Sequence, residues 1–333
     1  MKVIVDDKIP YIKEALNRLA DEVIYLPGKD ITAETVRDAD ALIIRTRTHC
    51  NKELLRGSKV RFIGTATIGF DHIDTDYCRS AGIAWSNCPG CNAGAVEQYV
   101  HASLLLLQKE KNVSLKQSCI GIVGVGHVGS RIASLAQRLG MRVLLNDPPR
   151  HDRGENGFCS LQKLAEECNI ITFHTPLIRK GTYKTFHLAN HAFFSMLKKK
   201  TYLINTSRGE VVDTEALLAA MDGKVADVIV DVWENEPDIN RELLEKAFIA
   251  TPHIAGYSAD GKANATRMVL EAFCQFFQKP VDFCITLPET ACPAADEDIR
   301  VLQQYNPHDD CKALRQHPEA FEKLREHYCL RRE

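Results

Sequence analysis

The stretch Cys119-Ile-Gly-Ile-Val-Gly-Val-Gly-His-Val-Gly129 decides the fold of the second half of this 333-residue chain. Its first five residues predict a buried strand, and apolar residues at helical spacing after it predict a helix. Between the two, the turn requires Gly124, the approach of a pyrophosphate requires Gly126, and helix packing requires Gly129. The order of strand, glycines and helix predicts a dinucleotide-binding unit. Its candidate cofactor-binding residues are Gly124, Gly126, His127, Val128 and Gly129.

Asp147 stands eighteen residues beyond Gly129, at the end of the next predicted strand. A carboxylate there can accept both hydroxyls of the adenosine ribose, so it favours NAD and repels the extra phosphate of NADP. Arg150 and Arg153 follow closely and weaken that preference. A helix-packing glycine cluster with a turn aspartate is the alternative interpretation, and a methyltransferase could also have such a loop. The motif therefore predicts a dinucleotide without naming a reaction.

Short β-branched runs alternate with helical patterns along the whole chain, without hairpin signals between the strands. This alternation predicts an α/β fold with parallel sheets covered by helices. Strands are expected at residues 3–5, 41–44 and 61–66, then at 119–123, 142–145, 170–173, 202–205 and 226–232, with a short last strand within 243–250. The later six fit a doubly wound nucleotide-binding domain.

Three further segments complete this organisation. A long helix is expected from Ala93 to Gln108, with Asn92 capping its first amides. Apolar residues from Met268 to Phe277 predict an amphipathic helix. Pro288, Pro293 and the acidic residues 296–298 then suggest a linker into a polar, helical tail.

The composition excludes several classes of protein. The net charge of −2 provides no general basic field for nucleic acid or a membrane surface. No apolar run is long enough to span a membrane, and Asp6 and Asp7 interrupt any signal sequence, so we expect a cytoplasmic protein. The twelve cysteines are expected to be reduced. Cys88-Pro-Gly-Cys91 has the spacing of a redox or half-zinc site, but no second ligand pair accompanies it, so a Pro-Gly turn is favoured and no metal is expected.

Three polar residues follow predicted strands, where ligands gather in parallel sheets. Arg208, in the stretch 204–213, could bind a carboxylate with two hydrogen bonds. His253, in the stretch 251–256, could serve as an acid or base near neutral pH. Glu236, in the stretch 231–237, could stabilise the protonated imidazole. Each residue alone is more often structural, and sequence spacing does not show that they touch.

These motifs together resemble the D-isomer-specific 2-hydroxyacid dehydrogenases, because they occur in the order seen in that family. The resemblance implies a Rossmann NAD-binding domain and a flavodoxin-like substrate domain, with the active site in a cleft between them. It also implies that Arg208 orients the substrate carboxylate, His253 accepts the hydroxyl proton and Glu236 supports His253. Further NAD contacts are implied for Asp147, Thr175, Asp231 and Gly256. Substrate contacts are implied for Thr46, Thr67 and Tyr257, with Arg45 as a candidate for a phosphate group.

Within this family, the resemblance covers most of the chain for the branch that oxidises 4-phospho-D-erythronate at C2. The resemblance therefore implies this substrate and a step in the synthesis of pyridoxal phosphate. It includes Gly64-Thr-Ala-Thr67, Cys88-Pro-Gly-Cys-Asn92, Asn146-Asp-Pro-Pro-Arg150 and Pro252-His-Ile-Ala-Gly-Tyr257. The implied domains are a substrate domain of residues 1–95 and 257–285, an NAD-binding domain of residues 96–256, and a shortened dimerisation segment of residues 286–333. We expect a homodimer, although the short segment puts the family's dimer in doubt.

Two rival functions remain open. A 3-phosphoglycerate dehydrogenase has the same motifs, and Arg45-Thr-Arg-Thr48 would suit it, but the stretches around Pro148-Pro149 and Tyr257 weigh against it. A corepressor that senses NAD(H) could also retain the three polar residues. The chain shows no disordered regulatory extension, and this disfavours a corepressor.

Overall fold

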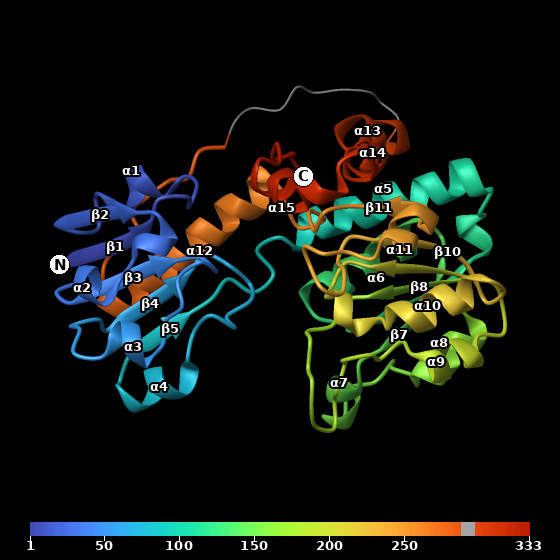
Figure 1. Ribbon diagram of the computed structural model, residues 1–333, viewed down its shortest axis with the longest axis horizontal. Helices are drawn as coiled ribbons and strands as arrows, with labels where there is room; N and C mark the ends of the chain where they lie inside the picture. The colour runs from blue at the N-terminus through green and yellow to red at the C-terminus, as the bar shows by residue number, and fades with distance from the viewer. Residues whose placement is uncertain (288–296) are drawn as a thin grey trace. The chain divides into compact units, whose positions relative to one another are not determined.

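The computed structural model describes residues 1–287 and 297–333. Contacts along the chain divide it into two compact units. Among the described residues, the first unit holds 1–92, 258–287 and Arg332, and the second holds 93–257, 297–331 and Glu333. Each unit is a parallel sheet with helices on it (Figure 1). The α/β fold class predicted from the sequence is confirmed.

The first unit is built on five parallel strands. They are β1 (Lys2–Asp6), β2 (Glu22–Leu26), β3 (Ala41–Ile44), β4 (Phe62–Thr65) and β5 (Ala84–Ser86). Their order, β2-β1-β3-β4-β5, is the flavodoxin-like order. The run from Val3 to Val5 is completely buried, as expected for a parallel strand covered on both faces.

The helix α12 (Ala259–Phe277) returns to this unit from the far end of the chain and packs on β4. Phe62 of β4 contacts the rings of Phe273, Phe276 and Phe277. The predicted amphipathic helix is therefore confirmed, and it completes the core of the first sheet. The shorter helices here are α1 (Ile12–Leu16), η1 (Gly28–Asp30), α2 (Ala33–Val36), α3 (Lys52–Leu55) and α4 (Thr75–Ser80).

The second unit is built on six parallel strands in the order β11-β10-β9-β8-β6-β7. They are β6 (Cys119–Val123), β7 (Arg142–Asn146), β8 (Ile170–Phe173), β9 (Thr201–Asn205), β10 (Val225–Val230) and β11 (Ile249–Ala250). The six predicted strands are thus confirmed. Beyond β7, a single bridge between Leu145 and Phe158 takes the place of the third strand in the doubly wound order.

Nine helical segments connect these strands. They are α5 (Ala93–Lys111), η2 (Leu115–Gln117), α6 (His127–Arg138), α7 (Pro148–Asp152), α8 (Leu161–Glu167), α9 (His191–Met196), η3 (Gly209–Val211), α10 (Thr214–Met221) and α11 (Arg241–Lys246). The predicted cap of α5 is wrong, because the buried Oδ1 of Asn92 accepts no hydrogen bond within the described residues. Asn92 packs closely against the start of α12, because a Cβ on Gly261 would lie 3.2 Å from the Cα of Asn92. This tertiary packing overrides the local preference of asparagine for capping a helix.

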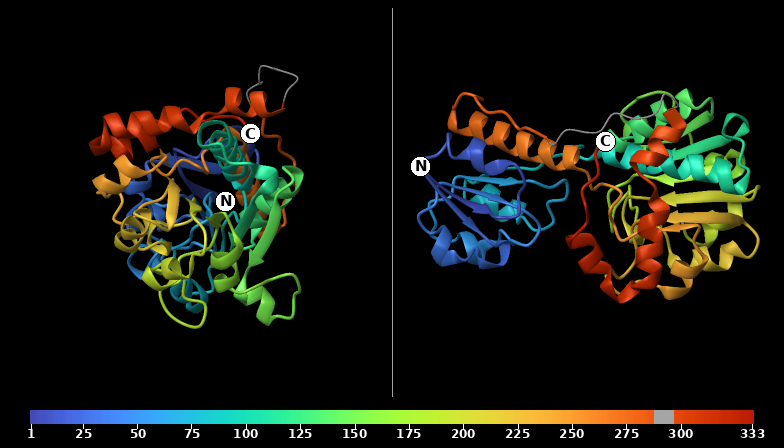
Figure 2. Two further views of the ribbon diagram at one scale, coloured as in Figure 1. Left: turned by 90° about the vertical axis from the view of Figure 1, so that its right-hand side faces the viewer. Right: turned by 90° about the horizontal axis from the view of Figure 1, so that it is seen from above.

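The described C-terminal residues pack on the second unit. The helix α13 (Glu297–Gln304) contacts α5, and α14 (Pro307–Gln316) contacts β11. After η4 (Pro318–Ala320), the helix α15 (Phe321–Glu326) buries Phe321 completely in the same core. Figure 2 shows the α13 and α14 segment beside α5. Pro288, Pro293 and Asp296 of the predicted linker lie outside the described residues.

The cysteines are mostly buried thiols. Cys88 donates to the backbone oxygens of Thr65 and Ala265, and burial raises its pKa to about 12. This environment supports the Pro-Gly turn over a redox site, because a redox thiol needs an accessible thiolate. Among the described cysteines, Cys284 and Cys329 are the exposed ones. Among the described side chains, no group of three or more His, Cys, Asp or Glu residues is placed to hold a metal.

Across residues 1–287 and 297–333, no helix has the length and apolar character needed to cross a membrane.

Candidate active site

The candidate site residues of the second unit follow the carboxyl ends of its strands. The glycine loop follows β6, Asp147 follows β7 and Thr175 follows β8. Arg208 and His253 follow β9 and β11. Because all the strands are parallel, these loops share one edge of the sheet, where α/β proteins bind ligands.

The glycine loop has the backbone that a pyrophosphate requires. Gly124 has a φ of 85°, and a Cβ on Gly129 would lie 2.0 Å from the backbone oxygen of Gly124. A Cβ on Gly126 would meet nothing within 4 Å, so space is open beside the loop. The first amides of α6, from His127 onward, have no acceptor within the helix and can face a phosphate.

Asp147 is fixed by the loops on both sides of it. Its Oδ2 accepts from the Val125 N–H at 2.8 Å, and its Oδ1 accepts from the Arg150 N–H at 3.1 Å. The guanidinium of Arg150 donates to Glu155 at 2.8 Å, and Arg153 pairs with the same carboxylate at 3.3 Å. The two arginines that weakened the NAD prediction are therefore both paired with Glu155.

Thr175 provides an independent indication of a ligand. Its Oγ1 is buried and has no hydrogen-bond partner within the described residues. Neighbouring His174 bridges two strand ends, because its ring nitrogens contact Thr172 at 2.9 Å and Thr206 at 3.3 Å. Burial lowers the pKa of His174 to about 3, so the ring is neutral. The open glycine loop and the unpartnered hydroxyl fit a bound NAD.

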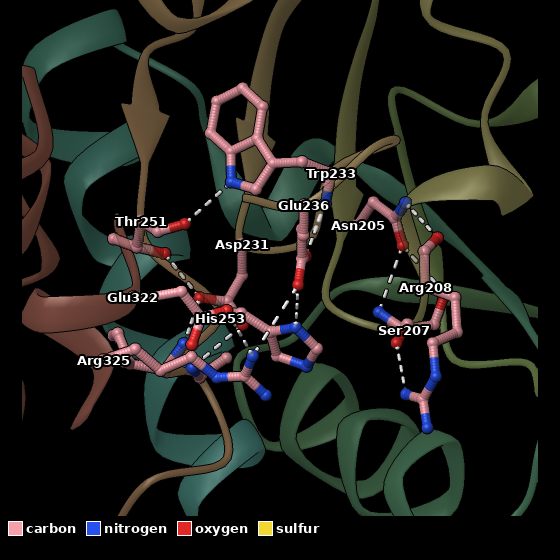
Figure 3. A network of polar contacts seen from close by, with 12 residues as sticks. Asn205, Ser207, Arg208, Asp231, Trp233, Glu236, Thr251, His253, Glu322 and Arg325 are labelled. Atoms are coloured by element: carbon pink, nitrogen blue, oxygen red, sulfur yellow. Dashed lines mark hydrogen bonds and ion pairs between the residues drawn. The ribbon is translucent and has the colours of Figure 1, made fainter. Parts of the chain in front are cut away.

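His253 and Glu236 form a hydrogen-bonded pair (Figure 3). Nδ1 of His253 lies 2.8 Å from Oε2 of Glu236. Oε1 of Glu236 accepts from the Trp233 N–H at 2.9 Å. Burial opposes ionisation of Glu236, but the contacts with His253, Trp233 and Arg325 outweigh it and lower its pKa. An ionised Glu236 fixes the proton on Nδ1 and leaves Nε2 of His253 for proton transfer.

Asp231 holds the loop that carries His253. Its carboxylate is 1% exposed and accepts from the Thr251 hydroxyl and from the backbone N–H groups of Ile254 and Ala255. Its backbone oxygen accepts from the His253 N–H at 2.8 Å. His253 has a φ of 58°, which is rare for a residue with a side chain. The hydrogen bonds of Asp231 stabilise this conformation.

Arg208 lies in a loop shaped by Asn205 at the end of β9. Nδ2 of Asn205 donates to the Arg208 oxygen at 2.9 Å, and Oδ1 accepts from the Ser207 N–H at 3.1 Å. The guanidinium of Arg208 donates to the Ser207 oxygen and pairs with no carboxylate in the described part of the chain. A Cβ on Gly209 would lie 1.9 Å from the backbone carbon of Trp233, so only glycine lets this loop pack against the loop of Glu236.

Two arginines of the C-terminal segment also reach these loops, and the sequence interpretation missed both. Nη1 of Arg325 lies 3.9 Å from Oε2 of Glu236, and Nε donates to the Tyr257 hydroxyl at 3.1 Å. Arg331 donates to the backbone oxygens of Ile254 and Ala255. No local motif marks these arginines, because their partners lie tens of residues away in sequence.

The remaining substrate candidates lie in the first unit, after its strands β3 and β4. Arg45 pairs with buried Asp6 at the end of β1, with Nε 3.3 Å from Oδ2. Thr46 is exposed. Thr67 donates to the Gly69 oxygen at 2.8 Å. Because β1, β3 and β4 are neighbours, these residues share the carboxyl edge of the first sheet.

The chain is similar to a described protein family and to proteins with named activities. Residues 93–255 match the family model described as D-isomer specific 2-hydroxyacid dehydrogenase, NAD binding domain. The chain is 60% identical to an erythronate-4-phosphate dehydrogenase of Bacteroides thetaiotaomicron, over 100% of this chain and 97% of the relative. It is 44% identical to one of Escherichia coli, over 100% and 92%.

Solved structures show the same fold. A D-lactate dehydrogenase of Aquifex aeolicus complexed with NAD and lactic acid has a TM-score of 0.67 and 28% identity, over 84% of this chain and 96% of that chain. The NAD⁺-bound 3-phosphoglycerate dehydrogenase of Entamoeba histolytica has a TM-score of 0.69 and 27% identity, over 86% and 99%.

Replacing Gly209 by alanine should separate the Arg208 loop from Trp233. We expect Gly209→Ala to destabilise the protein by about 2 kcal/mol, as for an overpacked core, and to lower turnover at least tenfold. Urea unfolding and steady-state assays measure both effects. Gly223→Ala is the matched control, because a Cβ there meets nothing within 4 Å. Equal stability of the two variants would contradict the packing argument.

Removing the charge of Glu155 should release the two arginines beside Asp147. We expect Glu155→Gln to bind NADPH about tenfold more tightly while NADH binding stays within twofold, because a free guanidinium attracts the 2′-phosphate. Nucleotide fluorescence gives both dissociation constants. Glu215→Gln, which removes an exposed carboxylate on α10, is the control. An unchanged NADPH constant in Glu155→Gln would refute this role.

Proposed function

Because the chain belongs to the D-isomer-specific 2-hydroxyacid dehydrogenases, and within them to the erythronate-4-phosphate dehydrogenases, we propose that it oxidises 4-phospho-D-erythronate. The product is (R)-3-hydroxy-2-oxo-4-phosphooxybutanoate. The chain is an NAD-dependent dehydrogenase, and the name of its relatives supports the substrate. The place in pyridoxal phosphate synthesis is what the family resemblance implies.

One observation carries the chemistry. The carboxylate of Glu236 holds Nδ1 of His253 at 2.8 Å, so Nε2 is the nitrogen that exchanges a proton. Arg208 has no carboxylate partner in the described part of the chain and can form a bidentate pair with the substrate carboxylate. A base and a cation are the two groups that oxidation of a 2-hydroxy acid needs from the protein.

The reaction then follows from these residues. Arg208 fixes the carboxylate and so orients C2 and its hydroxyl. Nε2 of His253 takes the hydroxyl proton, and Glu236 stabilises the imidazolium that forms. NAD, when bound, supplies the acceptor for the hydride that leaves C2. In the reverse direction, His253 returns the proton to the oxygen.

The ligand contacts belong to the same proposal. The residues that would hold NAD are Gly124, Gly126, His127, Val128, Gly129, Asp147, Thr175, Asp231 and Gly256. Those that would hold the substrate are Thr46, Thr67 and Tyr257, with Arg45 at the phosphate. Asp231 would have a structural role besides the proposed NAD contact, because its carboxylate accepts hydrogen bonds from the backbone of the His253 loop. The ion pair with Asp6 restrains the side chain of Arg45 at this edge of the first sheet.

We also propose a cytoplasmic homodimer. The family resemblance supports a dimer, and the small net charge gives no reason for a membrane surface. Sedimentation equilibrium measures the mass of the assembly against 37.3 kDa for one chain. A monomer at micromolar concentration would exclude the dimer.

Purified protein with NAD should reduce it when 4-phosphoerythronate is added. We expect kcat/KM for 4-phosphoerythronate to exceed that for 3-phosphoglycerate at least 100-fold, measured by NADH absorbance. A preference for the three-carbon acid would favour the 3-phosphoglycerate dehydrogenase. NADH binding without turnover of either acid would favour the corepressor.

Neutralising Glu236 should impair proton transfer while NADH binding is retained. We expect Glu236→Gln to lower kcat about 100-fold or more, because a neutral amide stabilises the imidazolium far less than a carboxylate does. NADH fluorescence and circular dichroism serve as controls for binding and folding. A kcat within twofold of the wild type would remove Glu236 from the mechanism.

A further inference from the structure

The helix α15 brings a cation to the His253–Glu236 pair. Nη1 of Arg325 lies 3.9 Å from the same Oε2 of Glu236 that contacts His253. Nε of Arg325 donates to the Tyr257 hydroxyl at 3.1 Å. Figure 3 shows Arg325 and His253 both next to the carboxylate of Glu236. One guanidinium therefore contacts both an acid–base residue and a proposed substrate contact.

The chain is fixed on both sides of Arg325, so its position is set by the fold. Phe321, four residues before it, is completely buried in the core of the second unit. Arg331, six residues after it, is 8% exposed and donates to the backbone oxygens of Ile254 and Ala255. Its guanidinium also lies 4.0 Å from the centre of the Tyr305 ring.

The charges around Arg325 favour an ionised Glu236. The groups that face Arg325 are Glu236, Tyr257 and Glu322, whose Oε1 lies 3.9 Å from Nη1. The groups that face Glu236 are His253, Arg325 and the Trp233 N–H. The side chain of Arg325 is 27% exposed, so water screens its charge less than that of a surface arginine.

We propose that Arg325 is a positioning residue of the dehydrogenase: it keeps Glu236 ionised against His253 and fixes the hydroxyl of Tyr257. This inference rests on the proposed function only for the role of Tyr257. The residues 321–331, which the family resemblance assigns to dimerisation, thereby become part of the active centre. A helix that only tied the C-terminal segment to its unit would not need a cation beside the acid–base pair.

The test compares Arg325→Gln with Arg325→Lys, which keeps the charge, and with Lys323→Gln. Lys323 is the matched control, because it is an exposed cation on the same helix. For each variant, kcat, KM and the pH dependence of kcat/KM are measured at constant ionic strength. The titration of the His253–Glu236 pair is followed separately by NMR of labelled histidine, with His253→Gln to assign the signal.

Removing the cation makes the pair easier to protonate. We therefore expect the acidic limb of the Arg325→Gln profile, and the NMR titration of the pair, to move to higher pH by about half a unit. We expect kcat/KM to fall about tenfold, with partial rescue in Arg325→Lys and no change in Lys323→Gln. Loss of the Tyr257 contact should also raise KM, since Tyr257 is a proposed substrate contact.

Two outcomes would overturn the inference. One is an Arg325→Gln protein whose titration superimposes on that of the wild type. The other is an Arg325→Lys variant as impaired as Arg325→Gln, since the charge would then not matter. The NMR titration needs no substrate, so a wild-type protein that oxidises neither acid would refute the proposed function while the role of Arg325 is still decided. Thermal unfolding verifies that each variant is folded.

Discussion

The buried carboxylate of Asp231 is the constraint on which the catalytic geometry depends. Burial raises its pKa, and the contacts with His253, Thr251, Ala255 and Ile254 oppose that rise. Each of the backbone N–H groups it satisfies would cost about 1–3 kcal/mol if left unpaired in the interior. The left-handed conformation of His253 persists because these hydrogen bonds over-determine the turn. Asp231 thus fixes the backbone of the loop from which His253 projects, and Glu236 orients the imidazole.

The parallel topology explains why so few loops suffice for the chemistry. In each sheet, neighbouring strands end at the same edge, so residues far apart in sequence become neighbours. In the second sheet, the loops after β6, β7 and β8 carry most of the proposed coenzyme contacts. The loops after β9, β10 and β11 carry Arg208, Glu236 and His253, and also the proposed coenzyme contacts Asp231 and Gly256. Close contact between the loops after β9 and β10 is possible because Gly209 has no side chain. The three residues proposed for the chemistry thus lie on one half of the strand order, and the proposed coenzyme contacts lie on both halves.

The sequence predicted what depends on local patterns and motifs. Apolar runs located the six strands of the second sheet and the strands β1, β3 and β4 of the first, and the glycine loop located the start of α6. The strands β2 and β5 were missed, because Glu22–Leu26 and Ala84–Ser86 are only partly buried or exposed and have no continuous aliphatic run. Arg208, Glu236 and His253 were found because each follows a strand within a recognisable stretch. Spacing alone did not show that Glu236 touches His253, since their contact depends on how two loops fold back. The sequence did not predict the roles of Arg325, Arg331 and Glu155, because charged residues of this kind are common on surfaces and belong to no motif here. The capping role predicted for Asn92 was wrong, because tertiary packing overrode the local preference.

The difference in burial among the cysteines determines which of them a thiol reagent can modify. Cys284, in the first unit, and Cys329, in the second, are the exposed cysteines of the described residues, while thiols such as Cys88 are enclosed and resist ionisation. A maleimide reagent reacts with accessible thiolates, so it should favour these two positions. Among the described residues, each unit therefore offers one exposed thiol for a spectroscopic probe. Distances between two such probes, with and without nucleotide, would measure whether nucleotide binding changes the separation of the two units.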